Sequence, residues 1–268
     1  MTPTREVSCR IELNALSAAR LVLQVAVASG HQRQQEELLV TLDGAPVEGV
    51  REVATTQGGR LHIADVGQGT IEVDYRAVVE GSAEPTEPSP DELFSYLRPS
   101  RYAESDKLFA IARREITGST PHELVPAAAS WVQNRLLYIG GSSRVTDGAV
   151  DTLLAGAGVC RDYAHLLTAL LRAHDVPARL VGVYAPGLFP MDFHAVVEAW
   201  LDDAWYVFDA TGLAPRQSLV RMSTGRDAAD TAFLTTHGGN VQLVSTSITA
   251  TASPDLPVDD PNALVALG

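Results

Sequence analysis

GVCRDYAHLL, residues 158–167, places a cysteine in the first turn of a predicted apolar helix, directly after a glycine-rich approach. The free backbone N–H groups and the positive end of the helix dipole both favour a thiolate at such a position. Cys160 is therefore a candidate nucleophile. The alternative is that Cys160 is a small buried hydrophobe, which is the commoner role of a single cysteine.

Strands are predicted to follow this helix. The helix is expected over 160–174 and must end before Pro177, because the residue that precedes a proline disfavours helical geometry. Alternating apolar residues then predict strands at 179–184, 193–201 and 204–209.

The last two strands form a predicted hairpin that carries a histidine and an aspartate. If the turn is centred on Asp202 and Asp203, His194 and Asp209 are diagonal neighbours on one face of the sheet, because side chains alternate with period two. Their backbones would then be about 7–8 Å apart, which the two side chains can close. A turn shifted by half a residue would place them on opposite faces, so the sequence permits this pairing without requiring it.

A thiol, an imidazole and a carboxylate are the three parts of an activated cysteine nucleophile. Cys160, His194 and Asp209 supply them within one segment of the chain. Taken singly, His194 also fits a core histidine and Asp209 a turn residue. A metal site of Cys160, His165 and His194 is a weaker hypothesis, because no second cysteine or carboxylate falls at ligand spacing.

Three blocks resemble the catalytic blocks of the bacterial transglutaminase-like superfamily: GVCRDYAHL at 158–166, MDFHAVVEAW at 191–200 and WYVFDAT at 205–211. This resemblance implies an α+β fold with a papain-like transglutaminase core, in which helices pack on an antiparallel sheet. It further implies that Cys160 is the nucleophile, His194 the base and Asp209 its orienting partner. No cofactor and no metal are expected.

The resemblance also implies a reaction class. We expect cysteine-dependent acyl transfer at amide bonds of peptides or proteins through a thioester, with hydrolysis by a cysteine peptidase or amidase as the first hypothesis. Two alternatives stay open. The chain could be a true protein-glutamine transglutaminase, or a catalytically silent binding or assembly module with the same fold.

The chain divides into four predicted regions. Residues 1–80 alternate like five short strands and predict a small all-β N-terminal domain, with Cys9 on its core face. Residues 81–90 are rich in proline and acid and predict a linker. Residues 91–252 are the predicted catalytic domain, and 253–268 lack a core pattern and predict a loosely held tail.

A helix predicted from Thr120 to about Tyr138 carries two candidates for the oxyanion hole, which needs donors aimed at the developing negative charge. The backbone N–H of Cys160 is the expected first donor. Asn134 and Tyr138 are candidates for the second, and Trp131 is expected in the core.

Other segments are less informative. Residues 140–148 could line a cleft beside the cysteine, although an ordinary flexible connection is the favoured interpretation. His165 is five residues beyond Cys160, so its side chain is expected to pack away from the thiol. After Asp209 the chain is predicted to be irregular as far as Gly239, apart from a short helix near 227–233, and a final strand is predicted over 240–251.

Composition narrows the class of protein. A net charge of −13 argues against nucleic-acid and anionic-membrane partners, and 46% apolar residues are enough for a sizeable core. Two cysteines make no disulfide framework. The first residues lack the pattern of a signal peptide, and no run approaches the roughly 18 apolar residues of a membrane span, so a cytoplasmic location is expected. The sequence indicates no oligomeric state.

Overall fold

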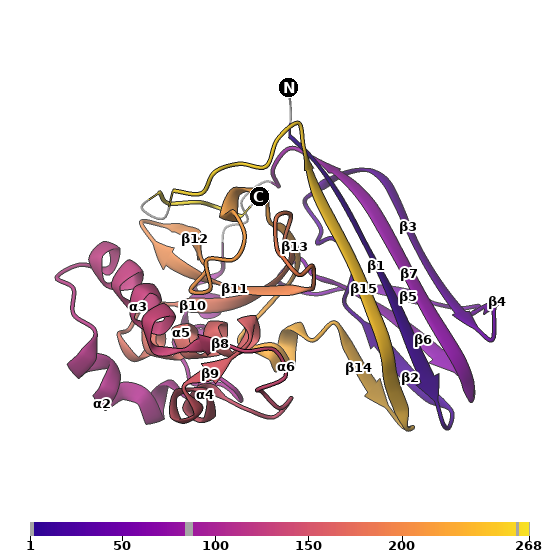
Figure 1. Cartoon of the computed structure of the whole chain (residues 1–268), viewed down its shortest axis with the longest axis horizontal. Coiled ribbons are helices and arrows are strands. Elements are labelled where there is room, and N and C mark those ends of the chain that lie inside the picture. The colour runs from indigo at the N-terminus through magenta and orange to yellow at the C-terminus, as the bar shows by residue number, and fades with distance from the viewer. Residues whose placement is uncertain (1–2, 84–87, 261–262, 268) are drawn as a thin grey trace.

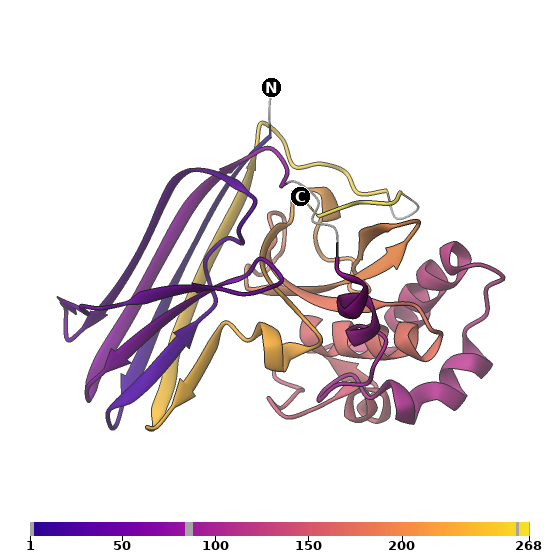
Figure 2. The same cartoon turned by 180° about the vertical axis from the view of Figure 1, so that it is seen from behind.

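The structure, a computed structural model, describes residues 3–83, 88–260 and 263–267. A sheet covered by helices lies beside a β-sandwich, as Figure 1 shows, and Figure 2 shows the same two bodies from behind. The sandwich joins two antiparallel sheets, and the helix-covered body is built on a third antiparallel sheet. The predicted α+β class, with an all-β region ahead of a transglutaminase-like core, is confirmed.

The N-terminal sandwich forms because apolar and polar residues alternate in several of its strands, most clearly in the first. In the first strand Val7, Cys9, Ile11 and Leu13 are buried while the residues between them reach the surface. The early strands are β1 (Thr4–Ala15), β2 (Ala19–Leu23), β3 (Gln32–Leu42), β4 (Ala45–Pro46), β5 (Arg51–Ala54), β6 (Arg60–Val66) and β7 (Gly69–Glu80).

Two late strands complete the sandwich. β14 (Leu234–His237) pairs with β2, and β15 (Val241–Ser253) pairs with β1 along its whole length. The sheets are therefore ordered β15-β1-β7-β3-β4 and β14-β2-β6-β5. The sequence predicted the strand at 240–251 but placed it in the region 91–252. Alternation identifies a strand and one buried face, but it does not identify which sheet edge the strand joins.

The second body holds the order of helix and hairpin expected from the sequence. Its helices are α1 (Pro90–Ser95), α2 (Ser105–Glu115), α3 (Pro121–Arg135), α4 (Ala149–Ala155), α5 (Cys160–Ala173), a 3₁₀ turn η1 (Arg216–Ser218) and α6 (Ala228–Thr231). Its strands are β8 (Leu137–Tyr138), β9 (Ala157–Gly158), β10 (Ala178–Tyr184), β11 (His194–Leu201), β12 (Ala204–Phe208) and β13 (Val220–Gly225).

Helix α5 lies at the centre of this body. Its Leu166, Leu167, Leu170 and Leu171 are fully buried in one core with residues of the sheet ordered β12-β11-β10-β13. Helices α2, α3 and α4 pack against α5. Because both ends of the helix are enclosed by neighbouring elements, the position of its first residue is fixed by packing.

The helix predicted to reach Tyr138 ends earlier. Helix α3 stops at Arg135, Leu136 is extended, and Leu137 and Tyr138 form β8, which pairs in parallel with β9. Backbone hydrogen bonds to the chain just ahead of α5 outweigh the local helical pattern. The segment after Asp209 also holds a strand, β13, that the sequence analysis missed, since its apolar alternation is only a few residues long.

The tail is held more firmly than its composition predicts. Arg216 donates from Nε to Asp259 at 2.9 Å, and the Val207 N–H donates to the Val265 carbonyl at 2.8 Å. Leu267 is buried against the sheet. These contacts correct the expectation of a loose tail at 253–268 for those of its residues that the structure describes.

The predicted linker at 81–90 is described only in part, because residues 84–87 lie outside the described residues. Helix α1 begins at Pro90, and Ser89 caps it by accepting the Glu92 N–H. Across the described ranges, no helix is long and apolar enough to cross a membrane.

Candidate active site

Cys160 is the first residue of α5, as predicted. The Asp162 carboxylate accepts the backbone N–H of Val159 at 2.8 Å, which caps the helix and fixes its start. The thiol is half-buried, and its Sγ lies 3.9 Å from the carbonyl oxygen of Phe193. A short backbone segment ahead of β11 therefore lies directly beside the thiol.

The hairpin has the register that the sequence favoured. Leu201 faces Ala204, and the ladder runs back to Val197 facing Phe208. Asp202 and Asp203 both have left-handed backbone angles, with φ of 46° and 60°, which suits a two-residue hairpin turn.

His194 and Asp209 consequently meet. His194 Nε2 and Asp209 Oδ2 are 2.9 Å apart, and both side chains are almost fully buried. The predicted pairing of these two residues is present in the structure.

Thr211 holds the aspartate in place. Its backbone N–H and its hydroxyl both donate to Asp209 Oδ1, at 2.8 and 2.7 Å, so that Oδ2 faces the imidazole. The sequence analysis did not single out Thr211. The signal was present, because an aspartate that accepts from the backbone two residues further on is a common turn motif.

The charges of the pair stabilise each other. Burial opposes the charged imidazole, but the Asp209 carboxylate and the Cys160 thiol raise the pKa of His194 to about 10. Burial likewise opposes the Asp209 carboxylate, but His194 and Thr211 hold the pKa of Asp209 below its usual value. His194 is thus an imidazolium at neutral pH.

The other ring nitrogen of His194, Nδ1, faces the thiol side. It is buried and has no hydrogen-bond partner in the described part of the chain, and the nearby Cys160 side chain contributes to the raised pKa of His194. The imidazole is therefore bonded to the carboxylate through one ring nitrogen, and its other nitrogen is left unpaired near the thiol.

Comparisons with known proteins identify the family of the chain. The sequence model of the transglutaminase-like superfamily matches residues 110–210. A presumed cysteine protease from Cytophaga hutchinsonii is 30% identical, with a TM-score of 0.87 over 98% of this chain and 96% of that one. This chain belongs to the transglutaminase-like superfamily.

More distant likenesses cover less. An uncharacterised protein of Mycobacterium leprae is 30% identical over 54% of this transglutaminase-like chain and 55% of its own length. A Mycobacterium tuberculosis protein is 32% identical over 40% of this chain and 39% of its own. The chain thus spans about half, or less, of these curated relatives. The periplasmic domain of TgpA from Pseudomonas aeruginosa is 18% identical over 78% of this chain and 90% of that domain, with a TM-score of 0.44.

Tyr138 is the oxyanion candidate that lies at the thiol of this transglutaminase-like site. Its side chain lies close to Cys160, whose backbone and thiol both influence the pKa of the phenol. Burial first, and then the neighbouring thiol, raise the pKa of Tyr138 to about 12, so it stays a neutral donor. The β8–β9 pairing, which sets Tyr138 opposite Gly158, brings it there.

The other candidates lie elsewhere. The Asn134 amide donates to the Ser130 carbonyl at 2.8 Å, so it is turned back along its own helix. Trp131 packs against the core, as predicted. His165 is fully buried, stacks on Tyr102 and accepts the Ala228 N–H, so its expected packing role is confirmed.

Residues 140–148 are tied to helix α5 by hydrogen bonds. Ser143 donates to Asp162 Oδ1 at 2.8 Å, and Arg161 donates to the Ser143 hydroxyl and to the Arg144 carbonyl. The loop is therefore an anchored wall beside Cys160. Asp162 was missed by the sequence analysis, although an acid at the third position of a helix is a recognised capping signal.

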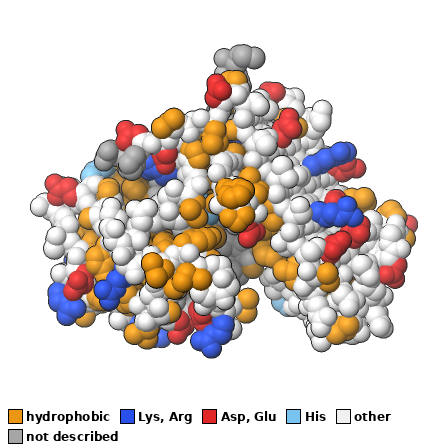
Figure 3. Space-filling model, in the orientation of Figure 1, with side chains coloured by type: hydrophobic (Ala, Val, Ile, Leu, Met, Phe, Trp, Pro, Cys, Tyr) orange, Lys and Arg blue, Asp and Glu red, His pale blue; other side chains and the backbone are white. Residues whose placement is uncertain are grey.

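The surface around the site is apolar and open. Exposed apolar side chains come from β8 and its loop and from the loop ahead of β11, namely Leu137, Ile139, Val145 and Phe189. Figure 3 shows hydrophobic side chains gathered in the middle of this face, beside the hollow between the two bodies. Over the described ranges, no three His, Cys, Asp or Glu side chains gather as a metal site.

Proposed function

We propose that this protein is a cysteine-dependent hydrolase that cleaves amide bonds of peptides or proteins through a thioester. The observation that carries the proposal is the grouping of Cys160, His194 and Asp209, with the imidazole and carboxylate 2.9 Å apart and the Cys160 side chain close enough to raise the pKa of His194. The 30% identity to a presumed cysteine protease across nearly the whole chain supports hydrolysis over transfer to an amine.

In the first step, the Cys160 sulfur attacks the amide carbonyl carbon. The C–N bond breaks as His194 gives its proton to the leaving amine, and the acyl group stays on sulfur as a thioester. In the second step, His194 takes a proton from water as the water oxygen adds to the thioester carbonyl carbon. The C–S bond then breaks, the carboxylic acid leaves, and Cys160 is restored as the thiolate beside the protonated His194. Asp209 keeps the imidazole oriented and stabilises its cation throughout.

The oxyanion needs two donors in this scheme. The Cys160 backbone N–H is the first, and the Tyr138 hydroxyl, which belongs to a side chain close to Cys160, is the second. Removing one such donor in other enzymes costs roughly 10²–10³ in kcat. Tyr138→Phe should therefore lower kcat by about that factor. Tyr163→Phe is the comparison variant, because the Tyr163 hydroxyl donates to the Leu136 carbonyl and this neighbouring tyrosine faces the core.

The direct test is a peptide and amide library assayed with wild type and Cys160→Ala. New peptide amino termini that appear only with wild type would support hydrolysis. A mass gain that requires added amine would show transfer instead, and turnover retained by Cys160→Ala would overturn the proposal. Because the variant removes only a sulfur atom from a half-buried side chain, its stability should change by about 1 kcal/mol or less.

A further inference from the structure

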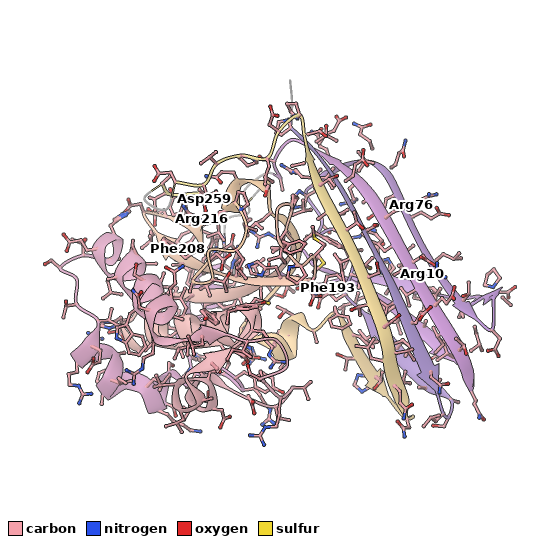
Figure 4. All side chains as sticks on the ribbon, in the orientation of Figure 1. Arg10, Arg76, Phe193, Phe208, Arg216 and Asp259 are labelled. Atoms are coloured by element: carbon pink, nitrogen blue, oxygen red, sulfur yellow. The ribbon has the colours of Figure 1, made fainter. Side chains whose placement is uncertain are left out.

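Four aromatic rings connect the N-terminal sandwich to the residue beside the candidate nucleophile. Tyr75 in β7 stacks on Tyr184 with centroids 6.3 Å apart, Tyr184 meets Phe193 at 5.6 Å, and Phe193 meets Phe233 at 5.1 Å. We call these four residues the aromatic column. Figure 4 labels Phe193 where it lies between the two bodies.

The sandwich end of the column is fixed by hydrogen bonds. The Tyr75 hydroxyl accepts the Val27 N–H at 2.8 Å and donates to Glu36 at 2.7 Å. The Tyr184 hydroxyl donates to the Val25 carbonyl at 2.9 Å, and its ring is fully buried at the end of β10. Both rings therefore have a defined position within one continuous core.

The other end of the column touches the reacting groups through backbone atoms. The Phe193 ring packs against the sandwich core, while its carbonyl oxygen lies 3.9 Å from Cys160 Sγ. Its N–H donates to the Asp192 carboxylate at 2.7 Å, and the next residue is His194. A displacement of the Phe193 ring would therefore move the backbone that lies beside the thiol and carries His194.

We propose that Phe193 is a positioning residue through which the sandwich holds His194 in line with Cys160. The sandwich is then part of the catalytic unit and not an appended module. The helix side of the sheet fixes Cys160 through α5, and the sandwich side fixes the start of β11 through the aromatic column. This role rests on the proposed hydrolase function.

The test compares steady-state kinetics of Phe193→Ala, Phe193→Leu and Phe233→Ala. Phe193→Ala should lower kcat by tenfold to about a hundredfold, the scale expected for a misplaced catalytic group, with KM nearly unchanged. Phe193→Leu keeps an apolar side chain in the column and should recover most of the kcat. Phe233→Ala removes the half-buried ring that packs on Phe193, and it should lower kcat by a smaller factor. This variant replaces Phe193→Ala in the test if Phe193→Ala does not fold.

Ile71→Ala is the matched control. Ile71 is fully buried in the same sandwich core but lies outside the aromatic column. Its replacement by alanine should therefore lower the unfolding temperature but leave kcat unchanged when the assay is run well below that temperature. Equal kcat losses in the Ile71 and Phe193 variants, or a wild-type kcat in Phe193→Ala, would overturn the role of Phe193. Turnover that survives Cys160→Ala would instead overturn the hydrolase function itself.

Discussion

Asp209→Asn should disable the site through a tautomer change. Asp209 Oδ1 accepts two hydrogen bonds from Thr211, so the asparagine carbonyl should take that place and its NH₂ should face His194 Nε2. Nε2 must then accept, and the single ring proton moves to Nδ1, which faces the thiol. An Nδ1 that already carries a proton cannot take one from Cys160.

The loss in kcat should be on the order of 10⁴, as for the same change in triads of other folds. At 1.36 kcal/mol per factor of ten, this is about 5.4 kcal/mol of transition-state stabilisation. The cost in folding should be smaller, at about 1–3 kcal/mol, because the Thr211 bonds survive.

The assay is kcat on the best library substrate, with thermal unfolding measured in parallel. Asp192→Asn is the control, because Asp192 is a carboxylate two residues ahead of His194 and its bond to the Phe193 N–H is one that asparagine can keep. Wild-type kcat in Asp209→Asn, together with a large loss in Asp192→Asn, would refute the reasoning and transfer the orienting role to Asp192.

Three further measurements follow from the structure. Iodoacetamide should label Cys160 well before Cys9, because Cys9 is buried and this burial raises the pKa of its thiol to about 11. Equal labelling of the two cysteines in mass spectrometry would count against a reactive Cys160. Glu198→Gln should lower the unfolding free energy by about 3–5 kcal/mol, because it removes the buried carboxylate that pairs with Arg179 at 2.7 Å and with Arg221 at 2.6 Å. A change below about 1 kcal/mol in a urea titration would contradict this prediction. The folded pKa of His194 is raised from the ordinary 6.5 to about 10, so the contribution of this residue to stability is fully present below about pH 6.5 and is lost as pH rises through about 10. The difference in unfolding free energy between wild type and His194→Gln should therefore shrink over that pH window. A difference that stays constant with pH would disprove this prediction.

The candidate site was largely predictable because its residues are fixed by local geometry. A cysteine at a helix start and a two-residue turn at Asp202 and Asp203 determine where Cys160, His194 and Asp209 point, and these depend on few distant contacts. The position of Tyr138 was not predictable from its helical pattern. The backbone of Tyr138 pairs with β9, which is nearly twenty residues away along the chain.

The sheet edges were also beyond local reasoning. β13 pairs with β10 with a register shift, and β15 pairs with β1, which lies near the other end of the sequence. Hydrophobic alternation does not indicate either of these partners. The hold on the tail likewise depends on Arg216, whose place above β12 appears only after the sheet is assembled.

The pairing of Thr4 with Ser253 and of Ala15 with Val241 makes the whole helical body an insertion between two halves of the sandwich. During synthesis, one edge of β1 stays without its partner until the ribosome has passed residue 253. The enclosed body, which has its own core around α5, can condense earlier. Closure of the sandwich is then a late step that spans nearly the entire chain, and such non-local pairing is intrinsically slow. Nascent chains stalled before β15 should therefore show a compact helical body with an open, aggregation-prone β1 edge.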